Sequence, residues 1–169
     1  HFKAGNGDDD AVDRESEASA LRSYLNTLQS EAYFLVMGDF NVYTAAEEGY
    51  QRLVESQSDD DGRLFDPIDQ AGEWHNDAAF AQIHTQSTRS SYGGWNYGGM
   101  DDRFDFILAS SSILNATDLD YVSDSYTAFG NDGNHFNVAI NSGSNEVVSD
   151  EMADALVEAS DHLPVFLEL

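Results

Sequence analysis

Three short apolar runs, each joined to a polar cluster, restrict the fold of this chain more than any other feature. The runs are Tyr33–Met37, followed by Asp39 and Asn41; Arg103–Leu108, which contains Asp105; and Leu163–Leu169, preceded by Asp161 and His162. Apolar runs of this length, bounded by polar residues or glycine, are typical of strands and short for core helices. The pattern predicts strands that carry carboxylate, amide and imidazole groups at or near their ends.

The three runs differ in how they should be buried. Tyr33–Met37 is continuously apolar, which fits a strand buried on both faces. Arg103–Leu108 alternates, so its even-numbered apolar residues should share one face and Asp105 should lie on the other. Leu163–Leu169 begins beside a proline and is expected to close the chain as a final strand.

Helical patterns lie between and before these runs. Residues 11–30 follow three aspartates, whose charge favours a helix N-terminus, and an apolar face is expected on Ala18, Leu21, Leu25 and Leu28. Residues 44–56 begin with a capping-box sequence at Thr44. A third helix is predicted over Asp150–Glu158, with Ser149 as its cap.

This mixture of elements predicts an α/β fold. Residues 57–102 and the stretch from Leu108 to about Asn145 are rich in polar residues and glycine and predict loops with short strands. No internal repeat or linker divides the sequence, so residues 1–169 are expected to form a single domain. No apolar stretch approaches the roughly 20 residues of a membrane span, and none is expected.

The charge balance is extreme, with 32 acidic residues against seven basic ones and a formal net charge of −25. A surface this negative repels phosphate backbones, so a basic nucleic-acid groove is not predicted. Three explanations stay open: adaptation to high salt, solubility outside the cell, or a site in which carboxylates hold cations. The absence of cysteine excludes disulfides, thiolate metal sites and a catalytic thiol.

Each polar cluster has a chemical and an ordinary explanation. Asp39 and Asn41 should point the same way from an extended chain, or else form a plain turn that bonds its own backbone. Asp105, between apolar neighbours, should hold a histidine, or else pair with Arg103. Asp161 and His162 should face opposite sides, so that one binds metal while the other meets substrate. The ordinary explanation is a structural or surface histidine.

Two further groups carry weaker signals. His84 and His135 lie in polar loops where a histidine could approach a substrate, but we favour ordinary solvent exposure for both. The aromatic residues of the long loop could stack on a base or sugar, or could pin the loop to the core. These residues are Trp74, Tyr92, Trp95 and Tyr97.

Taken together, the motifs GDFN at 38–41, RFDFIL at 103–108 and SDHLPV at 160–165 resemble the endonuclease/exonuclease/phosphatase superfamily. His1-x-Lys3 is similar to a preceding strand motif of that family, and Ile83–Gln86 and Gly130–Asn137 are similar to stretches in exported bacterial members. The resemblance implies a deoxyribonuclease I-like two-sheet α/β sandwich flanked by helices, of which this chain is the second half. A secreted protein is implied. Without the N-terminal part and its metal-binding Glu, we expect impaired turnover and either self-association or a partner fragment.

The resemblance also implies a function, hydrolysis of phosphodiesters such as DNA or RNA with Mg²⁺ or Mn²⁺. Asp161, Asp39 and Asn41 would contact the metal, and Asp39 would also orient or deprotonate the attacking water. His162, held by Asp105, would stabilise the phosphate in the transition state, with His1 as a second imidazole. Two alternatives stay open: a phosphatase or sphingomyelinase-like esterase acting on lipid or small-molecule phosphates, and an inactive binding module of the same fold.

Overall fold

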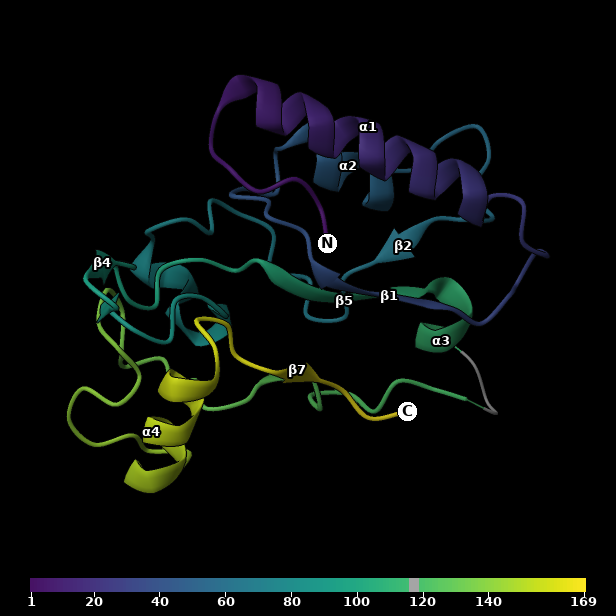
Figure 1. Cartoon of the computed structure of the whole chain (residues 1–169). Coiled ribbons are helices and arrows are strands. Elements are labelled where there is room, and N and C mark those ends of the chain that lie inside the picture. Colours follow the sequence, from purple (N-terminus) through teal and green to yellow (C-terminus); the bar gives the residue numbers. More distant parts are fainter. Residues whose placement is uncertain (116–118) are drawn as a thin grey trace. The chain divides into compact units, whose positions relative to one another are not determined.

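The computed structural model describes residues 1–115 and 119–169 and divides the chain into two compact units (Figure 1). Unit 1 comprises His1–Gly72, Asp105–Tyr126 and Leu167–Leu169, and unit 2 comprises Glu73–Phe104 and Thr127–Phe166. Small antiparallel sheets and helices occur together, which confirms the mixed α/β prediction. The single domain over residues 1–169 and the deoxyribonuclease I-like sandwich stay predictions.

A three-stranded antiparallel sheet organises unit 1. Its strands are β1 (Leu35–Asp39), β5 (Asp105–Ser110) and β2 (Leu64–Phe65), in the order β1-β5-β2. Strand β5 is central, and its residues are buried from Phe106 onward. Strand β1 lies at the edge and is only partly buried, with Met37 61% exposed, so the prediction that it is buried on both faces is wrong.

Two helices lie on one side of this sheet (Figure 1), α1 (Asp8–Leu25) and α2 (Glu48–Val54), and a short helix α3 (Ser111–Asn115) follows β5. Both longer helices were predicted, with different ends. The N-cap of α2 is Glu47, so Thr44 does not begin the helix as the capping-box pattern suggests; its hydroxyl instead accepts a bond from the Ala46 N–H in a turn.

The buried face of α1 differs from the predicted apolar stripe. Its buried residues are Arg14, Ala18, Arg22 and Leu25. Arg14 donates to the backbone oxygens of Lys3 (2.9 Å) and Gly5 (2.8 Å) and pairs with Glu47. The Arg14 guanidinium group tolerates burial because its N–H groups find acceptors.

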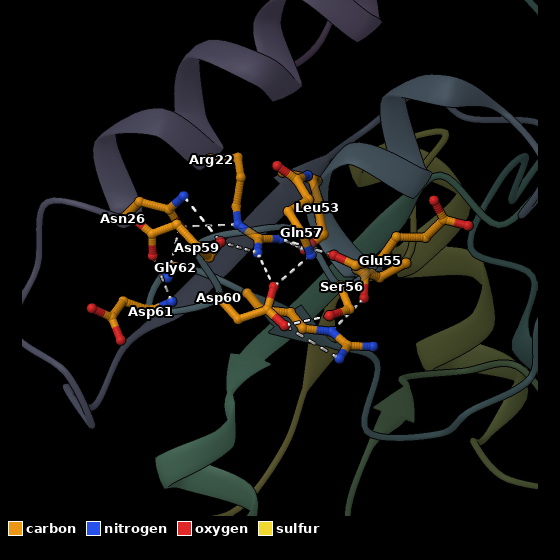
Figure 2. Close-up of polar contacts among 12 residues, drawn as sticks. Arg22, Asn26, Leu53, Glu55, Ser56, Gln57, Asp59, Asp60, Asp61 and Gly62 are labelled. Carbon is orange, nitrogen blue, oxygen red and sulfur yellow. Dashed lines mark hydrogen bonds and ion pairs between the residues drawn. The ribbon is translucent and has the colours of Figure 1, made fainter.

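Arg22 fastens the loop that follows α2 to helix α1 (Figure 2). Its guanidinium donates to the backbone oxygens of Leu53 (3.1 Å) and Asp59 (3.1 Å) and to Asp60 Oδ1 (2.8 Å). Asn26, just beyond the helix, accepts from the Gly62 N–H at 2.8 Å through its side chain. A polar, acid-rich loop is therefore ordered by hydrogen bonds rather than by apolar burial.

Aromatic edge contacts form the core of unit 1 beneath α2. The Phe40 ring meets Phe2 and Phe106 with centroids 5.0 and 5.4 Å apart, and Tyr50 lies 5.9 Å from Phe106. Leu53 is fully buried beside them. Edge-to-face packing of this kind adds to the free energy gained from burying the rings.

Unit 2 contains little regular structure. It comprises a 3₁₀ helix η1 (Ala78–Ile83), a hairpin of β3 (Ser91–Tyr92) and β4 (Trp95–Asn96), a ribbon of β6 (Thr127–Ala128) and β7 (Val165–Phe166), and the helix α4 (Asp150–Ala159). The Ser149 side chain accepts a bond from the Met152 N–H at 3.3 Å, which confirms the predicted cap of α4. The predicted final strand Leu163–Leu169 is reduced to the two residues of β7.

The core of unit 2 is formed by Met100, Ile140, Leu156 and Leu163. Isolated backbone bridges hold the loops around it, with Gln86 paired to Asp102 on one side and to His162 on the other. No helix among the described residues is long and apolar enough to cross a membrane.

Candidate functional site

The Asp39 carboxylate at the end of β1 is the best-defined polar group of unit 1. Its Oδ2 lies 3.3 Å from His1 Nε2, and its side chain is 12% exposed. Its Oδ1 accepts from the Asn41 backbone N–H at 2.8 Å. Gly38, the strand residue before it, has a φ of +148° and open space where a Cβ would lie. Both carboxylate oxygens of Asp39 therefore have a neighbouring polar group, and the side chain stays slightly exposed.

Asn41 does not continue the extended chain beyond Asp39. Its φ of 50° is left-handed, so the prediction that Asp39 and Asn41 point the same way along an extended chain is wrong. The hydrogen bond from the Asn41 N–H to the Asp39 side chain closes a turn. A plain turn of this kind was the ordinary explanation that the sequence offered for the pair. The Asn41 side chain, 6% exposed, donates through Nδ2 to the Phe2 oxygen at 3.1 Å, and its own oxygen is an acceptor.

Asp105 lies directly opposite Asp39 in the antiparallel register of β1 and β5. Residues directly opposite one another in such a pair project to the same face, with Cβ atoms about 5 Å apart. Two carboxylates in that position repel each other unless a cation or proton donor lies near them. We call His1, Asp39, Asn41 and Asp105 the Asp39 cluster.

A small pocket adjoins the Asp39 cluster. It has a volume of about 110 Å³ and is lined by His1, Phe2, Leu21, Val36, Met37, Gly38, Asp39 and Phe40. One side of the pocket is therefore apolar, and the His1–Asp39 pair provides its polar side.

Asp161 and His162 belong to unit 2, where Gln86 contacts both. The Gln86 amide nitrogen lies 2.9 Å from His162 Nε2 and 3.5 Å from Asp161 Oδ2. If the Gln86 N–H donates to His162 Nε2, the neutral imidazole carries its proton on Nδ1. Arg89 Nη2 lies 3.9 Å from Asp161 Oδ1. We call Gln86, Arg89, Asp161 and His162 the His162 cluster.

The structure thus gathers His1, Asp39, Asn41 and Asp105 in unit 1, and Asp161 and His162 in unit 2. The expected contact between Asp105 and His162 stays a prediction. Gln86 and Arg89 were not predicted as part of a site, although Gln86 ends the Ile83–Gln86 stretch. Only the tertiary bridge between Gln86 and His162 reveals the connection.

A third group, His75, Asp101 and Asp102, was missed entirely by the sequence analysis. Their ligand-type atoms all lie within 4.8 Å of one another, and His75 Nδ1 is 2.7 Å from Asp102 Oδ1. Burial raises the pKa of Asp102 to about 6, and the hydrogen bond from His75 opposes this shift only in part. Burial also raises the pKa of Asp101. We call these residues the His75 cluster.

The loop histidines are buried, so the favoured interpretation of solvent exposure is wrong. His84 is fully buried and bonds through Nε2 to the Trp74 oxygen at 2.8 Å, while His135 pairs with Asp132 Oδ1 at 2.7 Å. Burial lowers the pKa of His84. In Asp132, burial acts to raise the pKa of the carboxyl group. Hydrogen bonds from Glu146, Asn134 and His135 outweigh burial, so the pKa of Asp132 is lowered.

The loop aromatic residues differ in burial. Trp74 is fully buried, with the Arg103 guanidinium 5.3 Å from its ring, so it pins its loop to the core. Trp95, at the β3–β4 hairpin, is 75% exposed, and Tyr92 beside it is 47% exposed. The Arg89 guanidinium lies 4.4 Å from the Tyr92 ring.

No protein-family model matches the chain, and neither the curated proteins nor the solved structures contain a significant match to it. The resemblance to the endonuclease/exonuclease/phosphatase superfamily accordingly rests on the motifs quoted above and stays a prediction.

Proposed function

We propose that the chain is a divalent-metal-dependent phosphoric ester hydrolase that acts on phosphodiesters and has a deoxyribonuclease I-like fold. The observation that carries this proposal is the Asp39–Asp105 pairing. The two acids lie opposite each other on one face of the sheet, and an imidazole lies 3.3 Å from Asp39. Such an arrangement attracts a cation and provides a group that accepts or donates protons.

The donor groups fit Mg²⁺ or Mn²⁺. Asp39 offers a carboxylate oxygen, and Asn41 offers an amide oxygen, since its Nδ2 is engaged with Phe2. Asp161 is the further metal ligand that the family resemblance implies. Hard divalent cations prefer oxygen ligands of this kind. When bound, the cation neutralises charge on the phosphoryl and leaving oxygens.

The side chains of the chain itself have distinct proposed roles. Asp39 accepts the proton of the attacking water at its Oδ2, the oxygen that faces His1. His1, with its side chain 67% exposed, can approach a phosphate oxygen as a donor. His162 donates to a phosphoryl oxygen, and the bond from Gln86 restricts how its ring can turn.

A second candidate is an esterase acting on lipid or small-molecule phosphates. It is favoured by the positions of the seven basic residues. Four are buried, and the three others are paired with carboxylates: Lys3 with Asp10, Arg52 with Glu15 and Arg63 with Asp60. Over the described residues 1–115 and 119–169, a nucleic acid would therefore meet no unpaired surface lysine or arginine, whereas a small substrate needs none.

Hydrolysis assays with Mg²⁺ test both candidates. The protein, joined to the N-terminal part that the resemblance implies, is incubated with plasmid DNA, RNA, sphingomyelin and inositol phosphates, beside its variants Asp39→Asn and Asp161→Asn. Each variant should lose at least about 100-fold in rate on the substrate that the parent cleaves. Matched controls are Asp13→Asn in α1 and Asp154→Asn in α4, both of exposed aspartates, which should retain parental rates.

The substrate cleaved separates a nuclease from an esterase. If the parent cleaves none of the four substrates faster than Asp39→Asn and Asp161→Asn do, the proposed hydrolase is wrong and the inactive binding module takes its place.

A further inference from the structure

We propose that the His75 cluster is a binding site for a transition-metal dication of the Zn²⁺ or Mn²⁺ type, separate from the Asp39 and His162 clusters. The site combines one imidazole with two carboxylates, and their ligand-type atoms lie within 4.8 Å of one another. A mixed nitrogen and oxygen set suits Zn²⁺ or Mn²⁺, while Mg²⁺ and Ca²⁺ prefer oxygen alone.

The geometry needs only a small adjustment to hold an ion. Metal bonds of roughly 2.1 Å require ligand atoms no more than about 4.2 Å apart, and the ligand-type atoms of the cluster all lie within 4.8 Å of one another. The side chain of His75 is 51% exposed and can turn, while that of Asp102 is 9% exposed and fixed. An ion would therefore dock on Asp102 and be enclosed by movement of His75 and the half-buried Asp101.

The backbone around the cluster is firmly held. The Asn76 N–H bonds to the Asp101 oxygen at 2.7 Å, which ties the segment of His75 to the two aspartates. The Gln86 oxygen accepts from the N–H groups of both Asp101 and Asp102 at 2.9 Å. Three separate segments of unit 2 thus converge on one spot, and a bound ion would need little backbone rearrangement.

The charge of the cluster also calls for a cation. Asp102 is nearly buried and adjoins a second carboxylate, and the nearby His75 supplies at most one positive charge. Burying carboxylates is costly unless their charge is neutralised, and a divalent ion neutralises both acids at once.

A bound ion would act on the neighbouring His162 cluster through Gln86. The Gln86 backbone pairs with Asp102 on one side and with His162 on the other, and its side chain reaches His162 Nε2 at 2.9 Å. We therefore expect the ion to serve a structural role, holding the segment that presents Gln86 to His162.

Isothermal titration calorimetry of the metal-free protein with Zn²⁺, Mn²⁺, Mg²⁺ and Ca²⁺ tests the site directly. The parent should bind Zn²⁺ or Mn²⁺ at the His75 cluster, with an affinity at least tenfold lower in His75→Gln and in Asp102→Asn. Mn²⁺ bound at the proposed hydrolase site should be unaffected by these two changes. Asp154→Asn is the matched control, because it removes one exposed carboxylate of unit 2 and should keep this site. His75→Gln alters an exposed side chain, so it tests the site even if Asp102→Asn fails to fold.

Hydrogen exchange supplies a second measurement that does not depend on hydrolysis. Zn²⁺ or Mn²⁺ should slow amide exchange of the peptide containing Gln86 in the parent and leave it unchanged in His75→Gln. The inference is overturned if both His75→Gln and Asp102→Asn bind these ions as the parent does, or if the parent binds neither. Because Asp161→Asn tests the hydrolase separately, either proposal can fail without the other.

Discussion

The His84 imidazole shows how burial controls the charge of a single residue. The ring is fully buried, its Nε2 bonds to the Trp74 oxygen, and burial lowers its pKa. Between its folded pKa and the unfolded value of 6.5, the unfolded chain takes up a proton that the folded chain does not. The stability that depends on neutral His84 is present above pH 6.5 and is lost as the pH falls below it.

We therefore expect the parent to lose more stability than His84→Gln between pH 7 and pH 5. The glutamine can donate to the same Trp74 oxygen but does not titrate, and the difference should reach up to about 2 kcal/mol at pH 5. Urea unfolding at both pH values measures it. All other titrating groups are common to the two proteins and cancel. Equal pH dependence of the unfolding free energy in parent and variant would contradict the lowered pKa of His84.

At the scale of one element, α1 depends on arginines where an apolar stripe is expected. Arg22 is 2% exposed and satisfies backbone oxygens of the loop after α2, as Figure 2 shows. Its contacts fix a segment that carries three consecutive aspartates, 59–61. Helix α1 therefore anchors to unit 1 partly through hydrogen bonds to loop carbonyls.

Replacing Arg22 by methionine should lower the free energy of unfolding by about 3 kcal/mol, because it leaves buried carbonyls without donors. Arg52→Met is the matched control. Arg52 makes an ion pair with Glu15, and the two side chains are 46% and 33% exposed, respectively. That exposed pair should be worth less than about 1 kcal/mol. Denaturant unfolding of both variants measures the two costs, and equal losses would refute the role of Arg22.

On the scale of the whole molecule, the distribution of charge dominates. Four of the seven basic residues are buried, namely Arg14, Arg22, Arg89 and Arg103, so the surface is more negative than composition alone suggests. Self-repulsion among exposed carboxylates destabilises the compact state at low ionic strength.

We accordingly expect the melting temperature to rise by about 5 °C between roughly 0.02 and 0.5 M NaCl, as the Debye length shortens. Differential scanning calorimetry measures the shift. The double variant Asp13→Asn/Glu158→Gln removes two exposed charges and should show a smaller rise. A melting temperature that stays constant or falls with salt would be inconsistent with charge repulsion.

The sequence by itself determined the local elements and the residues at which chemistry should lie. The helix over Asp150–Ala159 with its Ser149 cap follows from local rules. The strands predicted over Tyr33–Met37 and Arg103–Leu108 are also present, each shifted by two residues to Leu35–Asp39 and Asp105–Ser110. The buried His84 could not be inferred in this way, because its burial depends on contacts between segments distant in sequence.

Only the tertiary structure decided which polar residues meet. It brought Asp39 opposite Asp105 and Gln86 beside His162, and it assembled His75 with Asp101 and Asp102 from segments some 25 residues apart. Such pairings are set by strand register and by the burial of donors and acceptors. The local periodicity of the sequence predicts neither strand register nor the burial of a particular donor or acceptor. The motifs therefore identified where to look, whereas the electrostatic environment of each group came from the fold.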